Sequence, residues 1–137
     1  MKSLLFWGIL SLPFFLAAQT ATLEVQVLDV SSSEGDILVA LYTEEETFLK
    51  FEHVYRTQGA PATEGMTRVI IADLPLGEYA LAIFHDENGN EELDTNLLGI
   101  PKEPLGFSNA KMKTFGPPSF EDCVFRFDSD QQIQIKL

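Results

Sequence analysis

The sequence is poor in the residues that build several common kinds of site. Its 137 residues include one cysteine and two histidines. A single cysteine cannot form an internal disulfide, and no Cys/His cluster has the spacing of a zinc site. Lysine and arginine number 9 against 21 aspartates and glutamates, which gives a formal net charge of −12. We therefore expect no nucleic acid partner, because phosphate contacts require a surface rich in Lys and Arg.

The chain also lacks an uninterrupted apolar run of about 20 residues, the length that spans a bilayer. Its longest run, Leu4–Leu16, follows a positively charged start, contains Pro13 and ends before Ala17 and Ala18. This is the layout of a secretory signal peptide covering residues 1–18. A transmembrane anchor is the alternative interpretation. We expect cleavage after Ala18, export to the periplasm or the extracellular space, and no stable membrane span after cleavage.

The remaining residues, 19–137, have the size of one domain. Alternation of apolar and polar residues at a period of two predicts short strands rather than helices. The predicted strands are Thr22–Val30, Ile37–Tyr42, His53–Thr57, Thr67–Leu74, Glu78–His85, Cys123–Phe127 and Gln132–Leu137. They predict an all-β fold, a single antiparallel β-sandwich of about seven strands with an immunoglobulin-like or transthyretin-like arrangement. The serine-rich turn after the first strand predicts that the first two strands form a hairpin.

Three local features refine this prediction. Thr43 and Glu46 have the spacing of a capping box, which predicts one helical turn after the second strand. The stretch Gln58–Ala62 contains glycine and proline and is predicted to be a loop. Cys123 alternates with aromatic residues, so we expect it to be a small buried hydrophobic residue rather than a reactive thiol.

The segment Glu78–His85 is apolar on both faces. Tyr79, Leu81, Ile83 and His85 share one face, and Ala80, Ala82 and Phe84 share the other. A strand of this kind is typical of the centre of a two-layer sandwich. His85 is in register with the apolar face, which favours a structural role for its side chain.

A long irregular stretch, Asp86 to Ser119, follows this strand. Connections longer than about 12–15 residues are uncommon in compact domains unless they are functional. The stretch opens with oxygen-bearing side chains at alternate positions, namely Asp86, Asn88, Asn90, Glu92 and Asp94. Calcium takes six to eight hard oxygen ligands, and alternate residues of a tight turn can direct oxygens to one point. We therefore predict these five residues as ligands of a weak calcium site, and we predict no catalytic residue and no other cofactor.

The same turn also fits a metal-free interpretation. Asn88-Gly89 is a strong hairpin signal, and acidic turns suit an acidic protein. An EF-hand is excluded, because that loop requires glycine where this chain has Glu91 and a bidentate glutamate where it has Leu97. Flanking helices are also not predicted.

Several motifs carry a resemblance to one bacterial family. They are Gly77–Ala80, His85–Asn90, Leu93–Asn96, Gly99–Glu103, Gly106–Asn109 and Gly116–Asp122. Over essentially the whole chain after residue 18, they resemble the secreted proteins called domain of unknown function 2141, whose members usually carry glycine at the position of Glu91. The resemblance implies export and a small β-sandwich, and it implies no activity.

Three functional hypotheses follow. The first is an exported, non-catalytic binding or structural module whose long loop is ordered by calcium. The second is a periplasmic hydrolase that uses His85 and a nearby carboxylate, which requires an exposed His85 beside a cleft. The third is a metal-free domain that binds an envelope or extracellular protein or glycan. Ser108 is not predicted to be a nucleophile, because its Gly-Phe-Ser-Asn context lacks the second glycine of a nucleophile elbow.

Overall fold

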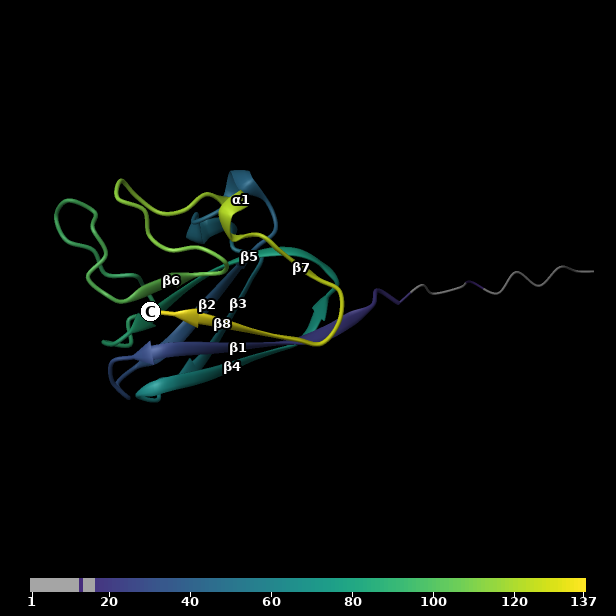
Figure 1. Cartoon of the computed structure of the whole chain (residues 1–137), viewed down its shortest axis with the longest axis horizontal. Coiled ribbons are helices and arrows are strands. Elements are labelled where there is room, and N and C mark those ends of the chain that lie inside the picture. The colour runs from purple at the N-terminus through teal and green to yellow at the C-terminus, as the bar shows by residue number, and fades with distance from the viewer. Residues whose placement is uncertain (1–12, 14–16) are drawn as a thin grey trace, which may run out of the picture.

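Strands dominate the computed structural model, which describes residue 13 and residues 17–137 (Figure 1). In chain order the elements are β1 (Thr20–Val30), β2 (Asp36–Tyr42), η1 (Glu45–Thr47), η2 (Phe51–His53), β3 (Arg56–Pro61), β4 (Gly65–Pro75), β5 (Gly77–Asp86), β6 (Leu105–Phe107), α1 (Phe120–Cys123), β7 (Phe125–Phe127) and β8 (Gln131–Lys136). Most of the predicted signal peptide lies outside the described residues. Within the described part, no helix is long and apolar enough to cross a membrane.

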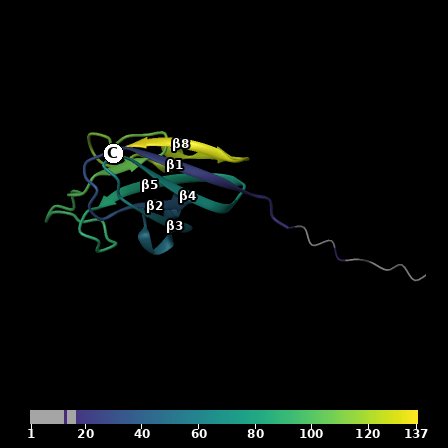
Figure 2. The ribbon, with the colours of Figure 1, turned by 90° about the horizontal axis from the view of Figure 1, so that it is seen from below.

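The strands form two sheets that lie face to face (Figure 2). One sheet has the order β4-β1-β8, and the other has the order β3-β2-β5-β6, with β7 also pairing with β5. The pairing of β1 with β8 is parallel, and the other pairs are antiparallel. The prediction of an all-β sandwich is thus confirmed, with eight strands where about seven were expected.

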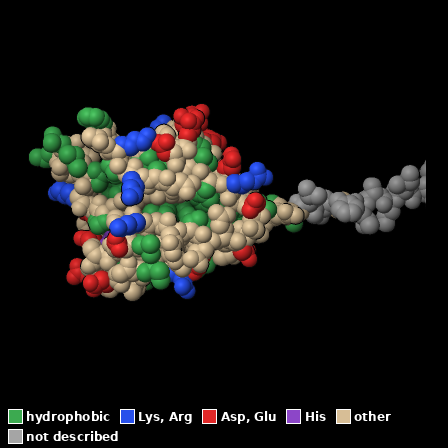
Figure 3. Space-filling model, in the orientation of Figure 1, with side chains coloured by type: hydrophobic (Ala, Val, Ile, Leu, Met, Phe, Trp, Pro, Cys, Tyr) green, Lys and Arg blue, Asp and Glu red, His purple; other side chains and the backbone are tan. Residues whose placement is uncertain are grey.

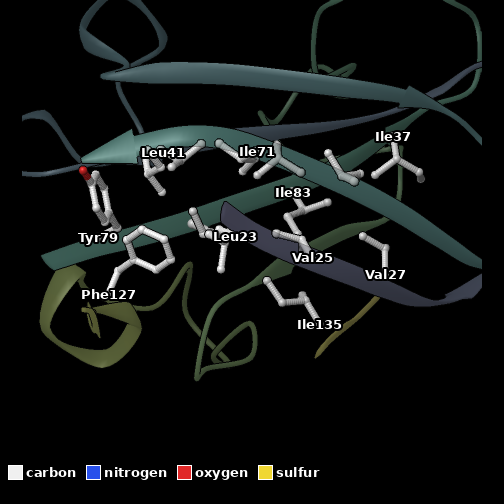
Figure 4. Packing of buried hydrophobic residues seen from close by; sticks show 14 of the residues in the cluster. Leu23, Val25, Val27, Ile37, Leu41, Ile71, Tyr79, Ile83, Phe127 and Ile135 are labelled. Atoms are coloured by element: carbon white, nitrogen blue, oxygen red, sulfur yellow. The ribbon is translucent and has the colours of Figure 1, made fainter. Parts of the chain in front are cut away.

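A hydrophobic core fills the space between the two sheets. Alternate residues of the strands supply it, because successive side chains of a strand point to opposite faces. Figure 4 shows these side chains pointing toward one another from both sheets, and its labelled members include Leu23, Val25, Ile37, Leu41, Ile71, Ile83 and Phe127. All of these labelled members are fully buried. The core therefore fixes the register of β1, β2, β4 and β5.

A second cluster lies on the outer face of the larger sheet. Tyr42 and Ala80, partners in register on β2 and β5, are fully buried there beneath Cys123 of α1. Phe48 contacts Tyr42 edge-on with ring centroids 5.3 Å apart, and Phe120 contacts Phe48 in the same way at 5.8 Å. The prediction that β5 is a central strand with two apolar faces is confirmed, because it lies between β2 and β6 and both of its faces are buried from Tyr79 onward. The burial of Cys123 is also as predicted.

The predicted hairpin of the first two strands is wrong. β1 pairs with β4 and β8, whereas β2 pairs with β3 and β5 in the other sheet. The serine-rich segment Ser31–Gly35 carries the chain from one layer to the other. Gly35 has a φ of +66°, and a Cβ there would lie 1.9 Å from the carbonyl oxygen of Asp86. Glycine thus allows this crossing to pass directly against the end of β5.

The third predicted strand, His53–Thr57, is displaced toward the C-terminus. The strand β3 covers residues 56–61, which include most of the predicted loop, and His53 ends η2. β3 lies at the edge of its sheet, where glycine and proline are tolerated. Gly59 also faces Leu38 closely, since a Cβ there would lie 2.9 Å from Cδ2 of Leu38.

The predicted capping box at Thr43 and Glu46 does not form. The short helix η1 has Glu44 as its N-cap, with no side-chain hydrogen bond. A capping box forms instead at the start of α1, where the Ser119 side chain accepts from the Asp122 backbone N–H and the Asp122 carboxylate accepts from the Ser119 N–H.

Candidate functional site

The outer face of the larger sheet carries an open groove beside the second cluster. Ala40 and Ala82, neighbours in register on β2 and β5, lie at its floor with the rings of Phe84 and Phe107. Because alanine side chains are small, the surface between the aromatic rings is recessed. The cavity has a volume of about 540 Å³, which lies within the range of about 300–1,000 Å³ that is typical of small-molecule sites.

Three segments form the walls of this apolar groove. One wall is Leu49 and Phe51, and the Phe51 ring contacts Phe84 edge-on with centroids 6.3 Å apart. The other walls are two loops between β5 and α1, which we call the first loop (residues 93–101) and the second loop (residues 112–117). Their lining residues are Leu93, Gly99, Ile100, Pro101, Met112, Lys113, Thr114, Phe115, Gly116 and Pro117. Lys113 and Thr114 are the polar side chains of a lining that is otherwise apolar.

Backbone hydrogen bonds hold both loops in shape. In the first loop, Thr95 and Pro101 form an isolated bridge, and the Asn96 side-chain oxygen accepts from the N–H groups of Leu98 and Ile100 at 2.9 and 3.0 Å. In the second loop, Lys113 and Gly116 exchange backbone hydrogen bonds. The walls of the groove are therefore built from closed turns rather than from open chain, which lowers the entropy cost of binding a ligand there.

The cationic group at the groove is paired. Nζ of Lys113 lies 2.5 Å from the Asp122 carboxylate, which also caps the start of α1. The Lys113 hydrogen bond, followed by that of the Ser119 N–H, lowers the pKa of Asp122 to about 2. This ion pair fixes the second loop against α1.

Three potential nucleophiles beside the groove, Cys123, Ser108 and Tyr42, are not activated. Burial, and to a lesser extent the Asp122 charge, raises the pKa of the Cys123 thiol to about 11, so the thiol stays protonated at neutral pH. Ser108 is buried, accepts from the Leu81 N–H and donates to the Cys123 carbonyl oxygen. Burial raises the pKa of Tyr42 to about 12, and Glu52 adds to this shift. The contacts of these three side chains are structural.

The predicted calcium ligands lie in one turn, but they are not equivalent. Asp86 is fully buried at the end of β5. Its carboxylate accepts from the N–H groups of Asn90 and Glu91 at 3.2 and 2.7 Å. The chain makes its bend at Glu91 with a φ of +62°, the left-handed conformation that the missing glycine would have favoured. Asp86 therefore closes the turn by binding backbone groups.

The exposed part of the turn brings three of the five residues together. The side-chain amides of Asn88 and Asn90 both donate to the Asp94 carboxylate, at 2.5 and 2.9 Å. The Glu92 side chain is exposed. Within residue 13 and residues 17–137, no three His, Cys, Asp or Glu side chains form a group that could hold a metal ion. Calcium binding thus stays a prediction. It would need the amide oxygens of Asn88 and Asn90, which in this structure accept from the N–H groups of Asn90 and Glu92.

A residue that the sequence analysis did not select closes this acidic turn. Glu103 is 8% exposed, and its two carboxylate oxygens accept from the N–H groups of Glu87 and Asp94 at 3.2 and 3.1 Å. It thereby joins the beginning and the end of the turn.

His85 has the structural position that its register predicted. The ring is fully buried, and Nε2 donates to the Glu34 carbonyl oxygen at 2.6 Å. A carbonyl oxygen only accepts, so this contact places the ring hydrogen on Nε2. Nδ1 has no hydrogen-bond partner among the described residues, and the nearest carboxylate oxygen, on Glu87, is 3.8 Å away. His85 does not line the apolar groove.

The groove itself was missed in the sequence. One signal was present, because the second face of β5 is Ala-Ala-Phe rather than polar. It was interpreted only as the mark of a central strand, although Ala82 and Phe84 are as little exposed as core residues, at 6% and 5%. A second signal was the number of apolar residues in the loops, since Leu97, Leu98, Ile100, Met112 and Phe115 are all exposed.

Comparisons with known proteins show a family but assign no activity. A family model described as an uncharacterized protein conserved in bacteria, DUF2141, matches residues 25–136. Two curated proteins named Signal peptidase I, from Streptococcus pneumoniae serotype 4 strain TIGR4 and from strain R6, are each 24% identical over 72 residues, covering 50% of this chain and 35% of theirs. The chain thus spans about a third of the length of these curated relatives. No solved structure matches the chain.

Proposed function

We propose that this chain, which belongs to DUF2141, an uncharacterized protein family conserved in bacteria, is an exported, non-catalytic binding module. Its ligand is a small apolar molecule held in the apolar groove. The observation that carries this proposal is the cavity of about 540 Å³ over the open half of the larger sheet. A cavity of this size with a largely apolar lining is the form that small-molecule sites usually take.

The chemistry of the lining disfavours a glycan, one of the partners predicted from the sequence, and favours an apolar molecule instead. A glycan would bring many hydroxyl groups, and burying these without hydrogen-bond partners is costly. The groove offers Thr114 and the already paired Lys113 as its polar side chains. An apolar molecule is matched to the remaining surface, and its transfer from water supplies the free energy of binding.

A fluorescence titration tests the proposal. The probe is N-phenyl-1-naphthylamine, a small uncharged molecule whose emission rises in apolar surroundings. Phe51→Ala removes one wall of the groove, and we expect an affinity about tenfold weaker, because about 1.5 kcal/mol of apolar contact is lost. Tyr55→Ala is the matched control, since Tyr55 is 48% exposed against 54% for Phe51 and packs on Tyr79 outside the groove. Equal affinities in the two variants would refute the assignment, as would a wild-type protein that binds no probe.

A second variant tests the site from its floor. Ala82→Leu adds three carbons between Phe84 and Phe107, so it should weaken probe binding while the melting temperature of the protein stays close to that of the wild type. Unchanged affinity in a folded Ala82→Leu protein would place the probe elsewhere.

We also propose that the acidic turn binds calcium weakly, at a site separate from the groove. The alternating spacing of the five predicted ligands supports this proposal. Asn88 and Asn90 lie against Asp94 through their NH₂ groups, so both amides must rotate to present oxygens to the ion. At an affinity of about 10⁻⁴–10⁻³ M, millimolar to ten-millimolar calcium should stabilise the protein by about 1–2 kcal/mol. Asp94→Asn should remove the calcium-dependent rise in melting temperature, and Glu64→Gln, on another exposed turn, should retain it. A wild-type melting temperature equal in calcium and in chelator would disprove the proposal.

The hydrolase hypothesis is not carried forward. It required an exposed His85 beside a cleft, and the structure buries the ring and engages Nε2 with a backbone carbonyl. The partial likeness to Signal peptidase I covers half of this chain at 24% identity, and we carry no activity over from it.

A further inference from the structure

Apolar side chains stand at the tips of the first and second loops, fully in solvent. Leu97 is 106% exposed and Leu98 is 83% exposed, at the apex of the first loop. Phe115 is 101% exposed at the apex of the second loop. Single exposed apolar residues are normal, but several at one end of a molecule mark an interaction surface. We call these three residues the loop tips.

The loop tips lie at one end of the sandwich. In Figure 1 both loops extend beyond the ends of the sheets, at the end opposite the first residues of β1. Figure 3 shows hydrophobic side chains at this end with Lys and Arg side chains beside them. Asp and Glu side chains gather at the lower edge of the same end in that view, apart from the hydrophobic tips. The tips thus form the outermost part of an apolar and basic surface.

The segment that carries the loop tips, residues 95–119, has a net positive charge, whereas the whole chain has a net negative charge. Residues 95–119 contain three lysines, Lys102, Lys111 and Lys113, and one acidic residue, Glu103, whereas the chain has 9 Lys and Arg against 21 Asp and Glu. The Glu103 carboxylate is 8% exposed and is bound to backbone N–H groups, so it contributes little to the surface. Lys113 is paired with Asp122, which leaves Lys102 and Lys111 with no ion pair among the described residues.

We propose that this surface docks on an anionic lipid bilayer, with Leu97, Leu98 and Phe115 inserted at the boundary of head groups and acyl chains. Apolar side chains that project from ordered turns can enter this boundary while nearby lysines contact lipid phosphates. Asp and Glu side chains gather at the lower edge of the same end, so the bilayer meets the loop tips and the lysines while that edge is turned away from it. A protein partner is less well matched, because separate projecting tips offer no continuous flat area to a second folded surface.

The docking surface shares Phe115 with the groove ligand site and otherwise lies outside it. Leu97 and Leu98 do not line the groove, whereas Phe115 does. The test therefore uses Leu97→Ser/Leu98→Ser, which alters the tip and leaves the groove lining intact. This double variant should bind N-phenyl-1-naphthylamine as the wild type does, so failure of the docking proposal and failure of the groove proposal can be told apart.

Vesicle co-sedimentation is the primary experiment, with the segment from Gln19 to Leu137, which contains every described strand and both hydrophobic clusters. We expect binding to vesicles of phosphatidylglycerol and phosphatidylcholine in equal parts, and weaker binding to phosphatidylcholine alone. Leu97→Ser/Leu98→Ser should weaken binding about tenfold or more. Ile70→Ser, which changes a 46% exposed residue on β4 away from the loops, should not. Loss of binding in both variants, or in neither, would overturn the assignment of the surface.

A spectroscopic reporter provides an independent readout. The single tryptophan of the chain is Trp7, so the segment from Gln19 has none. In Leu98→Trp, the emission should shift to shorter wavelength when phosphatidylglycerol vesicles are added, and high salt should reduce the shift by screening the lysines. Emission that stays at the wavelength of water-exposed indole would overturn the proposal. A dimer that forms through the loop tips without lipid, detected by sedimentation velocity, would also overturn the proposal.

Discussion

Glu103 is the residue at which one substitution tests the structure of the acidic turn most sharply. Its carboxylate accepts from the N–H groups of Glu87 and Asp94 and is almost entirely shielded from water. Glu103→Gln keeps the shape of the side chain and one oxygen. It replaces the other oxygen with an NH₂ group, which would face a backbone N–H as one donor facing another.

The magnitude follows from these two contacts. A hydrogen bond to a charged acceptor contributes about 1.5–3 kcal/mol, and a buried N–H left without an acceptor costs about 1–3 kcal/mol. Removing one negative charge beside Asp86 and Asp94 reduces repulsion and offsets part of the loss. We expect Glu103→Gln to lower the free energy of unfolding by about 1–3 kcal/mol, with a fall in melting temperature of roughly 5–10 °C.

Urea unfolding followed by circular dichroism, in a buffer with chelator, measures this difference. Glu92→Gln is the control, because Glu92 is exposed on the same turn and its substitution removes the same charge. It should change the free energy of unfolding by no more than about 0.5 kcal/mol. The reasoning fails if Glu103→Gln behaves like Glu92→Gln, since the two backbone contacts would then carry no net stability.

Three further predictions concern the region beneath and beside the groove. The pKa of Asp122, about 2 in the folded protein against 3.8 for the free group, means that its stabilising contribution is complete above pH 4 and is lost as the pH falls through 2. Asp122→Asn should therefore flatten the pH dependence of the melting temperature between pH 4 and 2, and a profile parallel to wild type would contradict this. The buried hydroxyl of Tyr42 has no hydrogen-bond partner among the described residues. Tyr42→Phe should therefore leave the free energy of unfolding within about 0.5 kcal/mol of wild type or raise it by up to about 1 kcal/mol. A loss above about 1 kcal/mol in chemical denaturation would show that the hydroxyl is bonded to water. Cys123 should react with a thiol reagent at pH 8 only after unfolding, because it is fully buried with a pKa of about 11, and rapid reaction of the native protein would mean that α1 opens.

The sequence predicted those parts of the fold that depend on local periodicity. The alternation in β5 placed Leu81 and Ile83 in the core and Ala80 on the second face, because the period of a strand assigns each side chain to one face. It could not predict the partner of each strand. The turn at Ser31–Gly35 has the composition of a hairpin turn, but it joins two sheets, and this depends on contacts with the end of β5.

The candidate site was less accessible to prediction, because it arises from incomplete coverage of a surface. Ala40 and Ala82 look like ordinary core residues in the sequence. They become the floor of a groove since Phe48 and Phe120 cover only the neighbouring part of the same face. No local sequence pattern indicates how much of a sheet face will be covered by side chains from other segments. In the acidic turn, the spacing of the oxygen-bearing side chains could be read from the sequence. The hydrogen bonds that close the turn could not, because they come from Glu103, nine residues beyond Asp94.

The most direct test of the groove as the ligand site is a map of amide chemical shifts in the protein labelled with ¹⁵N, recorded as N-phenyl-1-naphthylamine is added. The account predicts that the largest shifts occur at Ala40, Ala82 and Phe107 and in the second loop, with β4 unaffected. Shifts that are absent, or that spread evenly over both sheets, would contradict it.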